Sequence, residues 1–120
     1  MENVIYSGFD QDKYREEKRR RDAEYAALSD FGKFWFNCPK KVDKALTERK
    51  FERITGEGLD TRTFDRDSNG YECMSHRAAP AELIEGMRRY AAVCAEEQTE
   101  RRYIMHPATS LNKGRWRDYE

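Results

Sequence analysis

The sequence lacks any long hydrophobic segment. Across its 120 residues no apolar run approaches the roughly 18 to 20 residues of a membrane-spanning helix. The chain is also poor in cysteine: Cys38, Cys73 and Cys94 are odd in number and widely spaced, and no hydrophobic signal segment precedes them. This usage is typical of reduced thiols rather than of a disulfide framework. We therefore expect a cytoplasmic protein with no membrane partner.

The chain also lacks net charge, because 23 Lys and Arg residues are balanced by 23 Asp and Glu residues. This balance argues against a protein that coats nucleic acid through bulk positive charge. The charge is nevertheless segregated. Residues 33–53 carry seven basic and three acidic side chains, residues 101–120 carry five and two, and residues 1–30 carry six and eight. Any anion-binding face is therefore expected to be local.

Recognisable catalytic motifs are absent as well. The sequence has no Gly-x-Ser-x-Gly elbow and no glycine-rich phosphate loop, which are signatures of acyl transfer and of nucleotide binding. Its two histidines stand in no known arrangement with a nucleophile, and nothing singles out one pair among the many carboxylates. We expect a non-enzymatic protein with no catalytic residue, no cofactor and no small-molecule substrate.

What the sequence does contain predicts a small, mainly α-helical module. A chain of this length buries one modest core. The expected fold has three to four helices and a short β-hairpin insertion. Residues 1–30 are expected to form a charged N-terminal helical arm, and residues 31–120 a small helical domain with the hairpin at about 59–79.

The first predicted helix follows Asp10, a candidate N-cap. Its first half has good helix-forming residues but no apolar stripe, so this half is expected to be solvated. Pro39 is expected to end the helix and to open the next one as its first residue. In the second half of this first predicted helix, before Pro39, apolar side chains recur at helical spacing on one face: Tyr25, Leu28, Phe31 and Trp35.

The second predicted helix extends from Pro39 to Gly56 and Gly58, which end it. Its apolar positions predict an inward face made of Val42, Ala45, Leu46 and Ile54. Three lysines are expected on its outer face: Lys40, Lys41 and Lys44.

After this helix, residues 57–79 show no helical period. Asn69-Gly70 is the typical dipeptide of a two-residue hairpin turn, in which both residues take positive φ. Pro80 then opens the clearest helix of the chain, with an apolar stripe of Leu83, Met87, Tyr90 and Cys94. Gly86 inside this helix indicates a close approach by another segment. The tail after Arg102 is expected to hold no more than a turn of helix, at 108–111.

Residues 65–76 can be interpreted as part of a calcium site, as part of a zinc site or as a plain hairpin. Asp65, Asp67 and Asn69 match the opening of a calcium-binding loop, but His76 stands where the closing bidentate glutamate is needed. Cys73-x-x-His76 has the spacing of zinc ligands. A second paired element is missing from the sequence, although Cys38, Cys94 or His106 could complete a site. The hairpin is therefore the preferred interpretation, and no metal ligand is assigned.

The C-terminal segment alternates basic and aromatic residues. Single-stranded nucleic acid is bound by such surfaces, where bases stack on rings and cations pair with phosphates. Alternatively, Trp116 folds back and closes the core, with arginines lying around it. The candidate residues for nucleic-acid or partner binding are Lys40, Lys41, Lys44, Arg102, Tyr103, Lys113, Arg115, Trp116 and Arg117.

Three ordered segments resemble a known family. "YIMHPATSLNKGRWRDYE" is similar to the C-terminal motif of phage and prophage replication-initiation proteins of the replisome-organiser, helicase-loader type. "FWFNCPKKVDKALTERKF" and "APAELIEGMRRYAA" resemble the preceding segments of the same proteins, so that the resemblance covers roughly residues 31–120. The matching positions are Phe34, Trp35, Pro39, Lys41, Lys44, Phe51, Tyr90, His106, Pro107, Ala108, Thr109, Leu111, Asn112, Arg115, Trp116 and Asp118.

The chain departs from the family pattern in informative places. Ser110 replaces a tryptophan, Cys38 a tyrosine, Thr47 an alanine and Arg117 an acidic residue. The hairpin is not part of the pattern, and only about 30 charged residues stand where the family has a DNA-binding domain. Because Ser110 removes one of two paired aromatic residues, we expect Trp116 to serve structure more than DNA binding, in a turn against the helix of Tyr90.

These observations support two main functional hypotheses. The resemblance implies a phage-type accessory adaptor that binds single-stranded DNA, the replicative helicase, or both, in the host cytoplasm. The alternative is a small phage-encoded inhibitor of the anti-CRISPR type, which contacts a host defence complex through the charged arm and the hairpin. A calcium or zinc module is a third interpretation.

Overall fold

The computed structural model describes residues 11–119 and shows the predicted mainly helical fold with one two-stranded antiparallel hairpin. In chain order the elements are α1 (Gln11–Ala26), α2 (Asp30–Asn37), α3 (Lys44–Thr55), β1 (Leu59–Asp65), β2 (Gly70–His76), α4 (Pro80–Glu96), the 3-10 helix η2 (Arg101–Tyr103), α5 (Pro107–Asn112) and the 3-10 helix η3 (Arg115–Tyr119). Asp10, the predicted cap of the first helix, lies outside the described residues.

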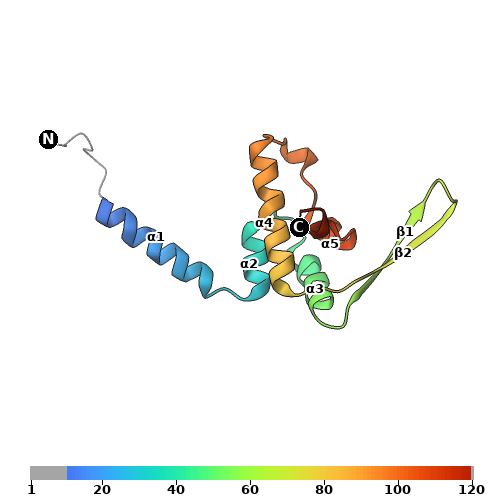
Figure 1. Cartoon of the computed structure of the whole chain (residues 1–120), viewed down its shortest axis with the longest axis horizontal. Helices are drawn as coiled ribbons and strands as arrows, with labels where there is room; N and C mark the ends of the chain where they lie inside the picture. The colour runs from blue at the N-terminus through green and yellow to red at the C-terminus, as the bar shows by residue number, and fades with distance from the viewer. Residues whose placement is uncertain (1–10, 120) are drawn as a thin grey trace.

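The molecule consists of a helical body with two projections. Figure 1 shows α1 extending from one side of the body and the β1–β2 hairpin from the other. The longest dimension is 71 Å, whereas the other two are 30 and 24 Å. Of the two projections, only the hairpin contributes to the core cluster, through Leu59 at its base.

The first half of α1 is solvated, as predicted, and in the second half only Tyr25 is half-buried. None of its 16 residues is buried, and its charges pair along the helix, with Lys18 Nζ 3.1 Å from Asp22 Oδ2. An isolated helix of this length is only marginally stable in water, because most helical stability comes from packing of an apolar face. Tertiary contacts therefore contribute little to α1.

The predicted continuous helix through Trp35 is wrong, because the chain breaks between α1 and α2. Ser29 caps the new helix: its Oγ accepts a 3.0 Å hydrogen bond from the amide of Gly32, which satisfies one of the free N–H groups of the first turn. The break changes the direction of the chain and leaves Leu28 39% exposed, whereas Phe31 is buried. The four predicted apolar residues therefore do not share one face.

The helix that precedes Pro39 ends before it, as predicted, but Pro39 does not begin the next helix. Helix α2 stops at Asn37, and α3 starts only at Lys44, after Asp43 takes the left-handed conformation with φ of 54°. In between, Lys41 Nζ donates to the carbonyl oxygens of Phe36 and Cys38 at 3.3 and 2.8 Å. Lys41 thus caps the last turn of α2, where a cation is favourable.

The predicted inward face of α3 is also partly wrong. Ala45 and Leu46 are exposed and Val42 is half-buried, whereas the fully buried positions are Thr47, Phe51 and Ile54. Thr47 tolerates burial because its Oγ1 donates to the carbonyl oxygen of Asp43 at 2.8 Å. The later start of the helix changes which residues face the body.

The hairpin lies where the sequence predicts it, but its turn is longer. Leu59 pairs with His76 at the base, and Asp65 pairs with Gly70 at the tip. Residues 66–69 therefore form a four-residue loop in which Asn69 has φ of 55°. Gly70 is the first residue of β2 and has no positive φ, so the predicted two-residue Asn-Gly turn is wrong.

Helix α4 is the centre of the body, as its stripe predicts. Leu83, Met87 and Cys94 are buried and Tyr90 is half-buried, and Pro80 occupies the first turn. Aromatic rings of α2 and α3 pack beside it, with ring centroids 5.2 Å apart for Phe34 and Phe51. The core cluster is Phe31, Phe34, Cys38, Phe51, Ile54, Leu59, Ala78, Leu83, Met87, Leu111 and Trp116.

Within residues 11–119, no helix combines the length and apolar character needed to cross a bilayer. After α4 the chain forms the predicted short helix as α5, at 107–112, and two short 3-10 helices that the sequence did not predict. The last of these, η3, returns to α4 and carries Trp116.

Candidate binding surfaces

Trp116 is buried in the body rather than displayed on it. Its side chain is 5% exposed, and it lies against Gly86 of α4, where an added Cβ would be 2.5 Å from Trp116 Cβ. The predicted close approach at Gly86 is therefore real, and Trp116 is the residue that makes it. The predicted turn against the helix of Tyr90 is confirmed.

His76 lies beside Trp116 and uses both of its ring nitrogens. It is fully buried, and its ring meets that of Trp116 edge-on with centroids 5.4 Å apart. Nε2 is 2.8 Å from the carbonyl oxygen of Asn112 and Nδ1 is 3.2 Å from Nη1 of Arg117. Because a carbonyl only accepts and a guanidinium only donates, this geometry fits Nε2–H donating to Asn112 and Nδ1 accepting from Arg117.

Asn112 connects three elements to this histidine. Lys50 of α3 donates to its Oδ1 at 2.8 Å, and Thr61 of β1 donates to its carbonyl oxygen at 3.1 Å. The next glycine, Gly114, has φ of 62° and leaves no room for a Cβ, which would lie 2.8 Å from Cε1 of His76. This network joins the base of the hairpin to the C-terminal segment, and only the Asn-Lys-Gly turn indicated it in the sequence.

The C-terminal cations of the predicted site are largely engaged within the molecule. Arg117 donates to His76 and its guanidinium lies 4.9 Å from the centroid of the Trp116 ring. Arg115 forms a 3.1 Å ion pair with Asp118. Lys113 is exposed and has no ion pair among the described residues. Of Lys113, Arg115 and Arg117, only Lys113 is therefore not engaged by another described side chain, and Trp116 offers no exposed face for a base to stack on.

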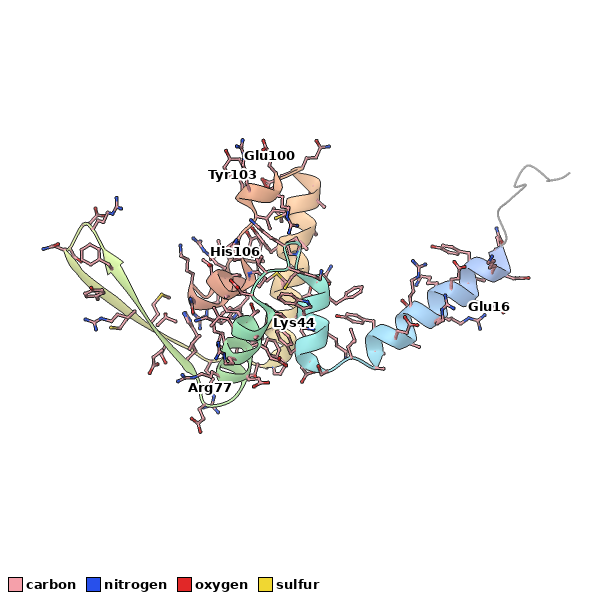
Figure 2. All side chains as sticks on the ribbon, turned by 180° about the vertical axis from the view of Figure 1, so that it is seen from behind. Glu16, Lys44, Arg77, Glu100, Tyr103 and His106 are labelled. Carbon is pink, nitrogen blue, oxygen red and sulfur yellow. The ribbon has the colours of Figure 1, made fainter. Side chains whose placement is uncertain are left out.

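The remaining predicted site residues lie in separate places. Figure 2 shows Tyr103 beside Glu100 at the far end of α4, and Lys44 near the middle of the molecule. Arg102 pairs with Glu100 at 3.0 Å and lies over the ring of Tyr103, which is 67% exposed. Lys40 is half-buried in the loop before α3. The structure does not gather the nine predicted residues into one surface.

The possible metal ligands are also engaged or separated. Within residues 11–119, no group of three or more His, Cys, Asp or Glu side chains is arranged to hold a metal ion. His76 has no ring nitrogen left for a metal, while Cys73 is exposed on the hairpin. Burial raises the pKa of the Cys38 thiol to about 12, despite the nearby Lys41, and its Sγ lies 3.3 Å from the carbonyl oxygen of Phe34.

The hairpin displays aromatic side chains far from the body. Phe64 and Tyr71 are 49% and 59% exposed, and they pair across the strands with ring centroids 5.4 Å apart. The guanidinium of Arg62 lies 4.1 Å from the centroid of the Tyr71 ring. We call this exposed surface the hairpin face. The inhibitor hypothesis expected the hairpin to be a contact surface, but it named none of these three residues.

A second exposed surface lies between α1 and the body. It is a groove of about 610 Å³, which we call the aromatic groove, lined by Tyr14, Lys18, Arg21, Asp22, Tyr25, Phe36, Asn37 and Arg88. Tyr25 joins α1 to α2: its hydroxyl accepts a 3.1 Å hydrogen bond from Asn37, and its ring packs on Phe36 with centroids 5.2 Å apart.

Arg88 is held at the rim of the aromatic groove by Glu85. Its Nε donates to the carboxylate at 2.8 Å, and Arg89 donates to the same carboxylate at 3.0 Å. The hydrogen bond from Arg88 lowers the pKa of Glu85 to about 2. The two arginines share one carboxylate, so this part of the rim retains a net positive charge.

No protein-family model, no curated protein and no solved structure matches the chain. The aromatic groove and the hairpin face are two exposed surfaces that the geometry itself offers for binding.

Proposed function

We propose that the protein is a non-enzymatic adaptor that binds another protein through its two projections, α1 and the β1–β2 hairpin. The observation that carries this proposal is the exposure of α1, a helix of 16 residues with none buried. A helix without a packed face gains its stability on binding a partner. The hairpin is in the same position, because a two-stranded sheet alone is marginally stable.

Burial of Trp116 favours a protein partner over single-stranded DNA bound by the C-terminal segment. Base stacking needs an exposed ring face, and Trp116 is 5% exposed. The projections carry exposed rings at Tyr14, Phe64 and Tyr71, and Phe36 of α2 is exposed beside α1. Exposed aromatic side chains next to arginine are typical of protein interfaces.

The resemblance of residues 31–120 to replication-initiation proteins makes the replicative helicase the first partner to test. A host defence complex is the second candidate, and one observation favours it: α1 and the hairpin both lie outside the resembling segments. The residues of the resemblance, such as Trp116, Asn112 and Phe34, contribute to packing. The proposal therefore assigns the choice of partner to α1 and the hairpin.

The test compares wild-type protein with a variant that carries Phe64→Ser and Tyr71→Ser. Both proteins are mixed with the purified helicase and with a purified defence complex of the host, and binding is measured by interferometry. We expect one of the two complexes to bind wild type and to lose at least about tenfold in affinity for the variant. Equal affinity for both proteins, or binding of neither complex, contradicts the proposal.

A further inference from the structure

One face of α1 has a coiled-coil-like pattern. Tyr14, Lys18, Arg21 and Tyr25 are spaced four, three and four residues apart, and all four line the aromatic groove. This spacing places them along one stripe of the helix. Aromatic residues stand at the ends of the stripe and cations at its centre. A partner helix lying along α1 would meet them in that order.

The ends of this stripe offer an exposed aromatic floor. Tyr14 is 48% exposed and Phe36, which lies across the groove on α2, is 62% exposed. Tyr25 is held against α2 by its contacts with Asn37 and Phe36, so the stripe is fixed to the body at one end. Aromatic rings of this kind receive the apolar side chains of a bound helix.

The centre of the stripe has positive charge that the protein itself does not neutralise. The groove is lined by three cations and one carboxylate. Lys18 pairs with Asp22, and Arg88 pairs with Glu85. Arg21 has no ion pair among the described residues. A carboxylate supplied by a partner would complete the charge pattern at Arg21.

We infer that the aromatic groove binds an acidic amphipathic helix of another protein. Its apolar side chains would pack on Tyr14, Tyr25 and Phe36, and one of its carboxylates would pair with Arg21. This inference rests on the proposed function as a protein-binding adaptor, and it adds the site and the chemistry of the partner segment.

Charge disfavours the two other occupants. In an antiparallel pair of α1 helices from two copies, Lys18 would oppose Arg21, and in a parallel pair each cation would oppose itself; both arrangements are repulsive. For a nucleic acid, the Asp22 carboxylate in the groove opposes the phosphates, and the formal net charge of the whole chain is zero. An amphipathic helix needs to place only one carboxylate, at Arg21, and its other contacts in the groove are apolar, so it does not set a row of negative charges against Asp22.

The test selects ligands from a displayed library of random peptides of about 16 residues, the length of α1, with the full chain as bait. Selected peptides are synthesised, and their affinities are measured by fluorescence anisotropy for wild type, Arg21→Glu and Arg20→Glu. Arg20 is the matched control, because it lies on the same helix in a different depression, with Lys13, Glu16 and Glu17.

We expect selected peptides to carry Asp or Glu among apolar residues spaced three and four apart. Their affinity should fall about tenfold or more with Arg21→Glu and remain within about twofold with Arg20→Glu. Replacing the peptide's central acidic residue by lysine should restore binding to Arg21→Glu. Phe36→Ser should also weaken binding, with helix content checked by circular dichroism.

Three results would overturn the inference: no acidic consensus, equal effects of the two arginine substitutions, or competition by a thymine oligonucleotide whose binding depends on Arg21. The last result would assign the groove to nucleic acid. The proposed function fails separately, because its own test uses the hairpin face. If the peptides lose their selectivity while partner binding still depends on the hairpin, the inference about the groove is contradicted and the proposed adaptor function stands.

Discussion

Residues 101–119 and the helix α1 both carry basic and aromatic side chains, yet they differ in where those side chains lie. The C-terminal tryptophan fits over Gly86 and beside His76, so its segment becomes part of the body. Helix α1 has no apolar stripe that could pack in this way, and none of its residues is buried. The comparison teaches that such a segment packs into the body where a small residue, such as Gly86, leaves space for its aromatic ring. Without that space the segment stays exposed and open to a partner.

The largest expected effect is the loss of the indole. Trp116→Ala should lower the free energy of unfolding by about 3–5 kcal/mol, because it removes a buried aromatic side chain and leaves a cavity. Urea denaturation followed by circular dichroism measures the change. Tyr103→Ala is the control in the same segment: its ring is 67% exposed, and the change should stay within about 1 kcal/mol. Similar losses for the two variants would contradict a structural role for Trp116.

Adding a side chain to Gly86, the residue on which Trp116 packs, should have a smaller effect. Gly86→Ala should destabilise the protein by about 1–3 kcal/mol, since the new Cβ would lie 2.5 Å from Trp116 Cβ and 2.9 Å from its Cα. The gain in helix propensity, about 1 kcal/mol, acts in the opposite direction. Thermal unfolding of the variant decides between them. A higher melting temperature would show that Trp116 does not lie on Gly86.

The thiols should report the same contrast between the body and the projections. Cys73 on the hairpin is exposed and Cys38 in the body is buried, so a thiol reagent near pH 8 should label Cys73 and leave Cys38 unmodified in the native protein. Mass spectrometry of the labelled protein identifies the positions. Prompt labelling of Cys38 would mean that the loop between α2 and α3 opens readily.

Cys38 also predicts a direction for stability against pH. Burial raises the pKa of its thiol from 9.0 to about 12. The unfolded thiol therefore ionises first, and the stability that Cys38 contributes is complete below pH 9 and is lost as the pH rises from 9 towards 12. Comparing wild type with Cys38→Ala across this range isolates the effect. A pH-independent difference between the two would contradict it.

The smallest effect is expected on α1. Lys18→Ala removes an exposed ion pair with Asp22 and should reduce helix stability by about 0.3–0.5 kcal/mol. Because α1 adds nothing to the core, the unfolding midpoint of the body should not change, while ellipticity at low temperature decreases slightly. A lower midpoint would indicate that the part of α1 around Lys18 also stabilises the body, beyond the contacts of Tyr25.

Much of the body could be predicted from periodicity and glycine placement. The stripe of α4, with Leu83 and Met87, depends only on spacing along one helix, and Gly86 indicated a close approach before its neighbour was known. The fold class and the hairpin position followed from the same local signals. Local patterns predict these features because they are repeated over several residues.

Other features depend on single residues or on distant partners, which the sequence does not reveal. Ser29 ends one helix and caps the next with one hydrogen bond, so a single side chain overrode an apolar pattern. His76 looked like a metal ligand because the residues that engage it, Asn112 and Arg117, are 36 and 41 positions away. The aromatic groove was not predicted because Phe36 lines it only when the chain breaks between α1 and α2, and the sequence predicted one continuous helix there.

Amide hydrogen exchange on the full chain tests the central contrast most directly. In the free protein we expect slow exchange in α4 and in residues 107–119, and exchange near the unprotected rate throughout α1. Adding a selected acidic peptide should slow exchange in α1 alone. Strong protection of α1 in the free protein, or rapid exchange of the amides around Trp116, would contradict the assignment of one segment to the core and the other to binding.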